Sequence, residues 1–160
     1  MKLRKKSDKK VVMISGGFDP IHIGHVRYIQ EAKKLGDYLV VVLNNDNWLR
    51  MKKGKEFMKE EERKEIIEAI AGVDKVIISG HTKNTKDKSV CEEIKKLRPH
   101  IFANGGDRKP DGDPVPEVAV CEELNIKMVY NIGRGGKVRS SSKLVKDYSK
   151  HLKKNATKKN

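Results

Sequence analysis

The chain has 160 residues, of which 36% are hydrophobic and 36% are charged, and its formal net charge is +14. This length predicts one domain, and no apolar run approaches the roughly 20 residues that a membrane-spanning helix requires. The basic N-terminus lacks the apolar core of a signal peptide. We therefore expect a cytoplasmic protein.

Two cysteines, Cys91 and Cys121, lie 30 positions apart with no second cysteine near either. This spacing provides neither a zinc ligand pair nor a disulfide framework. We expect free thiols in helical segments and a reducing compartment. The sequence predicts no metal site formed by the protein itself.

The positive charge is concentrated at the two ends of the chain. Residues 1–10 and residues 146–160 each carry a net charge of +5, which leaves +4 for the sequence between them. Blocks of like charge are typical of solvated, disordered tails. We predict a domain at 11–147 flanked by basic tails at 1–10 and 148–160. Incidental contact with RNA or a membrane surface is the alternative, and nucleic acid is not the expected partner.

Short apolar runs alternate with segments of helical periodicity along the domain. The runs predict strands at 11–15, 38–43, 73–79, 101–103 and 126–132. The periodic segments predict helices at 24–35, 60–71, 89–97, 116–124 and 141–151, whereas 44–59 reads as a polar loop. This alternation predicts a single α/β domain in which helices flank a five-stranded parallel sheet with right-handed crossovers.

A histidine pair follows the first predicted strand, in the segment His22-Ile23-Gly24-His25. At a strand-to-helix turn both imidazoles can face one cavity, and Gly24 lets a ligand approach the backbone. Helix-start N–H groups beside two imidazoles suit a triphosphate whose charge grows during displacement. The alternative is that one histidine caps the helix and the other lies on the surface.

The stretch Gly16-Gly17-Phe18-Asp19-Pro20-Ile21-His22-Ile23-Gly24-His25 resembles the signature of the cytidylyltransferase-like nucleotidyltransferases. The resemblance extends over residues 11–146. It implies a Rossmann-like fold in which a phosphorylated substrate attacks the α-phosphate of an NTP and pyrophosphate leaves. It also implies Mg2+ accompanying the triphosphate, and a homodimer.

The same resemblance assigns roles around the turn. His22 and His25 would contact the phosphates and stabilise the transition state. The backbone at Gly17 and Phe18 would hold the α-phosphate side, while Asp19 orients the loop and Gly16 and Gly24 complete the nucleotide-binding turn. At Gly17 several relatives carry Thr or Ser, so a hydroxyl contact is missing here.

Lysines and an arginine further along match other parts of the family pattern. In Lys52-Lys53-Gly54-Lys55, the catalytic lysines would be Lys53 and Lys55, with Lys53 on the substrate phosphate; Lys52 remains possible, and a solvated surface run is the alternative. Arg63 resembles a helix-start arginine that supports the triphosphate, against an ordinary helix-surface arginine. By weaker analogy, Lys83, together with Lys86 and Lys88, would hold the acceptor phosphate.

Two later segments complete the expected nucleotide site. In Asn104-Gly105-Gly106-Asp107-Arg108, Gly105 and Asp107 would read the base edge, with a simple glycine turn as the alternative. Arg139-Ser140-Ser141-Ser142 resembles the family's helix-start motif for the outer phosphates, although one serine as N-cap is expected for structural reasons alone. Arg134 resembles the arginine that often precedes this motif.

The resulting hypothesis is transfer of CMP or AMP from CTP or ATP to a small phosphorylated acceptor: glycerol phosphate, a phosphosugar or a phospho-alcohol. Asp19 is not expected to act as a base, because a phosphate nucleophile is already ionised. An aminoacyl-tRNA synthetase shares the histidine motif but needs a far longer chain. The alternative from another class is a non-catalytic module that binds nucleotides or nucleic acid with its basic tails.

Overall fold

The computed structural model describes residues 9–105, 115–133 and 139–158. Along the chain it contains β1 (Val11–Gly16), α1 (Ile23–Lys33), β2 (Tyr38–Leu43), α2 (Asp46–Lys53), α3 (Glu60–Glu68), β3 (Lys75–Ile78), α4 (Cys91–Leu97), β4 (Ile101–Gly105), α5 (Pro116–Glu123), β5 (Lys127–Ile132) and α6 (Ser141–Thr157). Within the described residues, no helix is long and apolar enough to cross a membrane.

The five strands form one sheet in the order β3-β2-β1-β4-β5, and every pairing is parallel. The chain runs outward from β1 through β2 to β3, then returns to the other side of β1 for β4 and β5. Such a reversal creates a crevice at the carboxyl ends of the central strands, where α/β proteins bind ligands. Here the crevice lies between β1 and β4.

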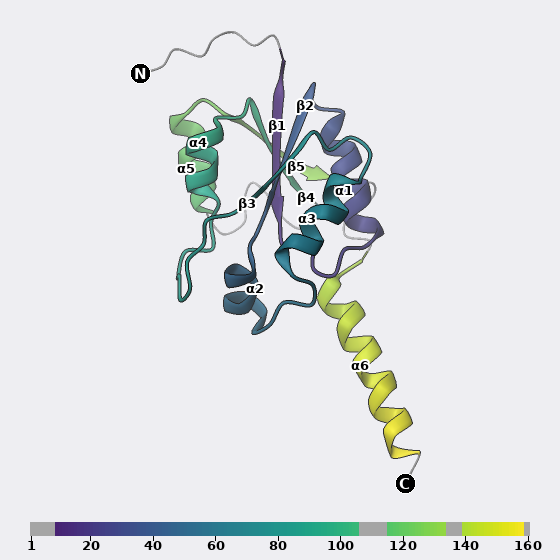
Figure 1. The fold of residues 1–160 in the computed structure, drawn as a ribbon. Helices are drawn as coiled ribbons and strands as arrows, with labels where there is room; N and C mark the ends of the chain where they lie inside the picture. The colour runs from purple at the N-terminus through teal and green to yellow at the C-terminus, as the bar shows by residue number, and fades with distance from the viewer. Residues whose placement is uncertain (1–8, 106–114, 134–138, 159–160) are drawn as a thin grey trace.

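Helices cover both faces of the sheet, with α1 and α3 on one side and α4 and α5 on the other (Figure 1). Successive residues of β1 point to opposite faces, as the pleat of a strand requires. Ile14 packs with Ile29 of α1 and Ile67 of α3, whereas Met13 packs with Ile94 of α4. The structure thus confirms a single Rossmann-like α/β domain with a five-stranded parallel sheet.

Helix α2 corrects the expectation of a polar loop at 44–59. Asn45 caps the helix by accepting from the Trp48 N–H at 3.0 Å. Gly54 ends it in the left-handed region with φ +84°, which glycine adopts at little cost. Both end signals are present in the sequence, but the lysines between them leave only Trp48 and Leu49 to be buried as apolar side chains.

Helix α6 begins at the predicted Ser141 and continues to Thr157, beyond the predicted end at His151. It projects away from the sheet (Figure 1) and buries none of its residues. The segment expected to begin a basic tail at 148 is therefore helical through Thr157. Residues 1–8 and 159–160 lie outside the described part, so the two-tail division stays a prediction.

Both cysteines are free thiols and both are buried, as the sequence predicts. Cys91 begins α4 and Cys121 lies in α5, on the face of the sheet away from α1. Burial raises the pKa of the Cys121 thiol to about 11 and also raises that of Cys91. These side chains are apolar core residues rather than reactive groups.

Candidate active site

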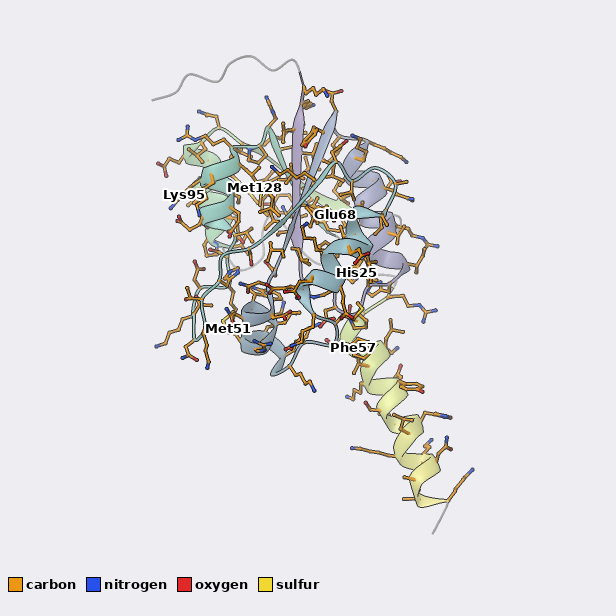
Figure 2. All side chains as sticks on the ribbon, in the orientation of Figure 1. His25, Met51, Phe57, Glu68, Lys95 and Met128 are labelled. Carbon is orange, nitrogen blue, oxygen red and sulfur yellow. The ribbon has the colours of Figure 1, made fainter. Side chains whose placement is uncertain are left out.

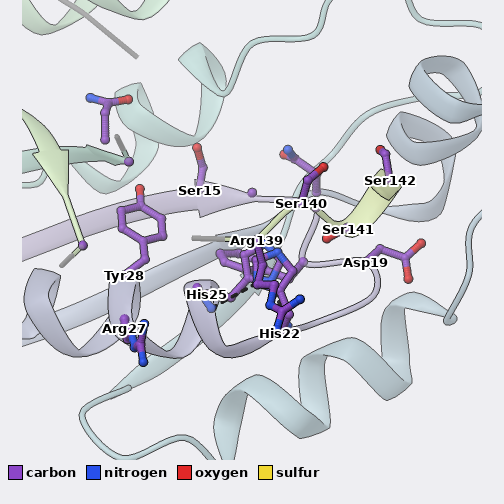
Figure 3. Close-up of a pocket in the computed structure, with 18 of the residues that line it drawn as sticks. Ser15, Asp19, His22, His25, Arg27, Tyr28, Arg139, Ser140, Ser141 and Ser142 are labelled. Carbon is purple, nitrogen blue, oxygen red and sulfur yellow. Dashed lines mark hydrogen bonds between the residues drawn. The ribbon is translucent and has the colours of Figure 1, made fainter. Parts of the chain in front are cut away.

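A cavity of about 400 Å³ lies at the carboxyl ends of β1, β2, β4 and β5 and reaches the start of α6. Its lining includes most of the residues expected from the sequence: Gly16, Gly17, Phe18, Asp19, His22, Gly24, His25, Lys53, Gly105, Arg139, Ser140, Ser141 and Ser142. In the view of Figure 3, Asp19 and the three serines lie on one side of the histidine pair and Tyr28 on the other. Segments from the whole length of the domain therefore meet at one site.

The two histidines cap α1 reciprocally. The Nδ1 atom of His22 accepts from the Gly24 N–H at 3.0 Å, and Nδ1 of His25 accepts from the His22 N–H at 3.2 Å. A neutral imidazole that accepts at Nδ1 carries its proton at Nε2. Both rings thus have an Nε2–H donor, and both line the cavity. The capping and ligand-binding interpretations are compatible, because each uses a different nitrogen.

Ring packing holds the histidine pair in place. The His22 and His25 rings stack with centroids 3.8 Å apart, and the Phe18 ring meets His25 edge-on at 5.0 Å. A Cβ on Gly24 would lie 2.9 Å from the His22 ring, so a side chain there would displace it. Phe18 itself has φ +49°, an uncommon conformation for a large side chain. The conformation of the turn therefore fixes the positions of the two histidine rings.

Gly17 lacks the hydroxyl that several relatives carry, and the structure gives a reason. A Cβ at this position would lie 3.0 Å from Leu49 and 3.3 Å from Trp48, both on α2. The turn thus packs directly against α2, and the space that a Thr or Ser would need is already filled. A side chain at position 17 would therefore require Leu49 or Trp48 to move.

Asp19 fixes the loop that follows α2. Its two carboxylate oxygens accept from the N–H groups of Phe57 and Met58, at 2.6 and 2.8 Å. The carboxylate is buried and both oxygens are already engaged, which suits an orienting role rather than a base. The Asp19 carbonyl oxygen also accepts from Lys53 Nζ at 3.1 Å. This contact ties the end of α2 to the histidine turn.

Of the lysines considered, Lys52 and Lys53 line the cavity. They lie in the last turn of α2, where Lys52 Nζ also stands 4.6 Å above the Trp48 ring. Lys55 and Lys83 are exposed, and neither belongs to the cavity lining among the residues that the structure describes. The geometry brings Lys53 to the site as expected, with Lys52 rather than Lys55 beside it.

Arg63 is neither a surface residue nor a member of the cavity lining within the described ranges: its side chain is 0% exposed. Nη1 donates to the carbonyl oxygens of Gly17 and Asn44, each at 2.7 Å. Nη2 pairs with Asp46 at 2.7 Å, and Nε donates to the Met58 carbonyl oxygen at 3.0 Å. In this structure Arg63 holds the backbone that forms the walls of the cavity.

The start of α6 forms another wall of the cavity. Ser140 is the N-cap and accepts from the Lys143 N–H at 3.4 Å. The Ser141 hydroxyl donates to the Pro20 carbonyl oxygen at 2.8 Å, which joins α6 to the histidine turn. Helix-start N–H groups here can bind anions. Of the remaining expected residues, Asp107 and Arg134 lie outside the described residues.

Several lining residues were not expected from the sequence: Ser15, Arg27, Tyr28, Asn44, Trp48, Asn104, Ile132 and Gly133. Tyr28 follows His25 by three positions, so it shares the same helix face, and its hydroxyl donates to the Ala103 carbonyl oxygen at 2.7 Å. Asn44 follows β2 directly, and its buried Oδ1 has no hydrogen-bond partner among the described residues. Both positions could have been found from strand ends and helix spacing.

Comparison with known proteins supports the family resemblance. The chain matches the model of a family described as cytidylyltransferase-like over residues 13–131. It is 40% identical over 110 residues to the bifunctional protein HldE of Pelobacter propionicus, covering 68% of this chain and 21% of HldE. It is 39% identical over 102 residues to the FAD synthase of Ferroglobus placidus, covering 64% of this chain and 62% of that protein.

A solved structure agrees with the fold. The lipopolysaccharide core biosynthesis protein of Thermoplasma volcanium superposes with a TM-score of 0.63 at 29% identity, covering 78% of this chain and 98% of that protein. The matched region is only about a fifth of the HldE proteins. The match to the family model nevertheless includes most of the domain, from β1 to β5. The chain belongs to the cytidylyltransferase-like family.

Proposed function

We propose that this protein is a nucleotidyltransferase that transfers CMP or AMP from CTP or ATP to a small phosphorylated acceptor and releases pyrophosphate. The observation that carries the proposal is the histidine pair, whose Nδ1 atoms are both engaged by the backbone while both rings line the cavity. We propose that each ring donates from Nε2 to a phosphate oxygen of the bound nucleotide. Membership of the cytidylyltransferase-like family supports the same reaction class.

The proposed mechanism is an in-line transfer without a covalent intermediate. Positioning and charge neutralisation dominate such reactions. His22 and His25 donate from Nε2 to the phosphate oxygens on which charge develops, while Lys52 and Lys53 supply positive charge from the end of α2. The α6 start at Ser140–Ser142 offers backbone N–H groups to the outer phosphates. The attacking phosphate oxygen is already ionised, so no general base is needed.

Mg2+ enters this proposal as part of the substrate. Among the described residues there is no group of three or more His, Cys, Asp or Glu side chains that could hold a metal ion. The carboxylate of Asp19, which lines the cavity, has both oxygens engaged by backbone N–H groups. Mg2+ is commonly held by substrate phosphates and water with few protein ligands. We therefore propose that it arrives bound to the triphosphate.

The base and the acceptor are the finer parts of the proposal. The name of the FAD synthase relative refers to a product that contains an AMP unit, which favours ATP as donor, with CTP as the second candidate. Two cavity-lining lysines favour a phosphorylated acceptor. On the family resemblance we propose a homodimer that acts in the cytoplasm.

The test is pyrophosphate release with each of the four NTPs and Mg2+, across glycerol phosphate, sugar phosphates and phospho-alcohols. The proposal predicts turnover with at least one pair of ATP or CTP and an acceptor, dependent on both substrates. NTP binding in calorimetry without turnover for any pair would favour the non-catalytic binding module instead. Turnover with a non-phosphorylated acceptor would contradict the assigned acceptor class.

A further inference from the structure

Asn44 carries a polar group that the fold itself does not use. The residue follows β2 directly, is only 4% exposed and lines the cavity. Its Oδ1 atom is buried and has no hydrogen-bond partner among the described residues. Buried side-chain amides are normally hydrogen-bonded, because losing the hydrogen bonds that water provides destabilises the folded state. An unpaired amide oxygen in the wall of a cavity therefore indicates a group that binds a ligand.

The three polar residues that follow Asn44 all have structural partners. Asn45 caps α2 through its Oδ1 atom, and its Nδ2 atom donates to the His81 carbonyl oxygen at 2.7 Å. Asp46 forms a buried ion pair at 2.7 Å, and Asn47 Nδ2 donates to the same His81 carbonyl oxygen at 2.9 Å. Of these four described residues, Asn44 alone has a buried side-chain atom without a partner. Local structure thus explains its neighbours but not the Asn44 amide.

Hydrogen bonds hold the backbone of Asn44 on both sides. Its N–H donates to the Gly16 carbonyl oxygen at 2.8 Å, and its carbonyl oxygen accepts from Arg63 Nη1 at 2.7 Å. The side-chain amide can nevertheless turn, because the torsion that precedes an amide group has a broad distribution. Oδ1 can therefore rotate from its buried position toward a ligand in the cavity while β2 and α2 stay in place.

The chemistry of the amide selects a hydroxyl group as its partner. An amide presents an acceptor oxygen and a donor nitrogen, and a hydroxyl group is likewise both a donor and an acceptor. A hydroxyl group therefore matches the amide in either of its two orientations. An ionised phosphate oxygen has no proton to donate to Oδ1, and an ammonium group has no lone pair to accept from the amide N–H. Asn44 thus suits the hydroxylated carbon skeleton of a substrate rather than its phosphate.

The position of Asn44 in the sheet favours the acceptor over the nucleotide. Strands β2 and β4 lie on opposite sides of β1. The base is expected at Gly105 on the β4 side, whereas Asn44 leads into α2, whose Lys52 and Lys53 line the cavity. In Figure 2, α2, which carries Met51, lies at the end of the sheet from which α6 projects. The Asn44 amide and the lysines that favour a phosphorylated acceptor therefore reach the cavity from the same side.

We propose that Asn44 recognises a hydroxyl group of the phosphorylated acceptor, and that the acceptor is therefore a polyol phosphate or a sugar phosphate. The inference rests on the proposed function, because it assigns the acceptor side of the same site. It narrows that function by excluding phospho-alcohols that have no hydroxyl group besides the esterified one. Asn44 binds and orients the acceptor and takes no part in the bonds that form and break.

The experiment is isothermal titration calorimetry of the full chain with Mg2+ and a methylene analogue of ATP or CTP that cannot release pyrophosphate. Two ligand pairs are compared: glycerol phosphate with propyl phosphate, and glucose 1-phosphate with cyclohexyl phosphate. The wild type is expected to bind the hydroxylated member of at least one pair more tightly. Asn44→Ala is expected to weaken the binding of that ligand about 3- to 10-fold, the range of one neutral hydrogen bond, and to leave its partner ligand unchanged.

Thermal unfolding and a matched variant separate recognition from folding. Asn44→Ala should keep Tm close to that of the wild type, because Oδ1 contributes no hydrogen bond within the described part of the chain. The control is Asn47→Ala, three positions along and absent from the cavity lining among the described residues. It removes the hydrogen bond to His81 and should leave the affinity for all four phosphate ligands unchanged.

Several outcomes would overturn the proposal: a wild type with no preference in either pair, an Asn44→Ala variant that keeps the preference, or equal weakening of all ligands together with a lower Tm. Weaker binding of the ATP or CTP analogue alone would assign the amide to the nucleotide instead. Binding is measured without turnover, so the two proposals fail separately. Hydroxyl selectivity without pyrophosphate release would contradict only the catalytic proposal, and pyrophosphate release without that selectivity would contradict only the role of Asn44.

Discussion

The Arg63 guanidinium donates to the Gly17 carbonyl oxygen at 2.7 Å, which links α3 to the histidine turn across 46 positions of the chain. The same nitrogen bonds to the Asn44 carbonyl oxygen at the end of β2. An arginine expected at the triphosphate is thus a buried clamp beneath the site. We expect Arg63 to affect activity indirectly, by fixing the backbone of Gly17 and Asn44 at the cavity.

Replacing Arg63 is expected to destabilise the fold strongly. Arg63→Met leaves the buried Asp46 carboxylate and three carbonyl oxygens without their donor, and breaking such a buried pair costs about 3–5 kcal/mol. Urea unfolding measures the change. The control is Lys64→Met, whose partly exposed ion pair with Glu68 should contribute less than about 1 kcal/mol. If the two substitutions lower the free energy of unfolding equally, the buried contacts of Arg63 do not stabilise the fold as described.

The lysines of α2 and of the following loop should differ in their effect on turnover. Lys53→Met is expected to lower kcat/KM about 10- to 100-fold, because it removes a charged donor beside the histidine turn. Lys55 lies two positions further along the chain and is not part of the cavity lining among the described residues. Lys55→Met is therefore expected to leave kcat/KM within about twofold of the wild type. Steady-state pyrophosphate release measures both. A larger effect at Lys55 would show that the loop rearranges when substrate binds.

Gly17 should not tolerate a side chain. Gly17→Ala brings a Cβ within 3.0 Å of Leu49, and overpacking of this kind costs about 1–3 kcal/mol. Gly80→Ala is the matched control, because the nearest atom to its added Cβ, on Glu93, is 3.8 Å away. Thermal unfolding distinguishes them. If Gly17→Ala is as stable as the wild type, the packing argument for the missing hydroxyl is wrong.

The ion pairs of Glu56 predict an acid-sensitive part of the stability. Hydrogen bonds from Arg50 and from Lys59 hold the pKa of the Glu56 carboxyl well below its ordinary value of 4.5. A carboxyl whose pKa falls on folding stabilises the native state above its unfolded pKa, and this stabilisation is lost as the pH falls below about 4.5 toward the folded value. Glu56→Gln should therefore lower Tm at pH 7 and have a progressively smaller effect toward pH 2. As a control, substitution of the exposed Glu65 by Gln should change Tm little at either pH. If Glu56→Gln lowers Tm by the same amount at pH 7 and at pH 2, the Glu56 carboxyl does not cause the acid-sensitive stability.

The sheet was predictable from the sequence because its strands are nearly continuous apolar runs. Residues 38–43 agree with β2 at both ends, and the other four strands are displaced by no more than two residues at either end. Helix α2 was missed because its polar surface hides the periodicity, although Asn45 and Gly54 mark its two ends. The length of α6 was missed because a lysine-rich segment without buried residues has the composition of a tail.

The parts of the candidate site that are formed by a short contiguous motif could be predicted from the sequence. The parts that depend on packing between distant segments could not. The histidine turn and the serine-rich helix start were identified as short motifs. The burial of Arg63 depends on three carbonyl groups and Asp46, which only the folded chain brings together. The choice between Lys52 and Lys55 depends on α2, because a helical turn directs consecutive residues differently from an extended loop.

The histidine pair offers the most direct test of the account: pyrophosphate release by His22→Asn beside His22→Ala, with the NTP and acceptor that the wild type uses. Asn can still cap α1, so His22→Asn should keep about 1 kcal/mol of stability that His22→Ala loses. Neither retains the Nε2–H donor, so both should lose about 10²- to 10³-fold in kcat. Wild-type kcat in His22→Asn would show that the ring is only a helix cap and would contradict nucleotidyl transfer at this site.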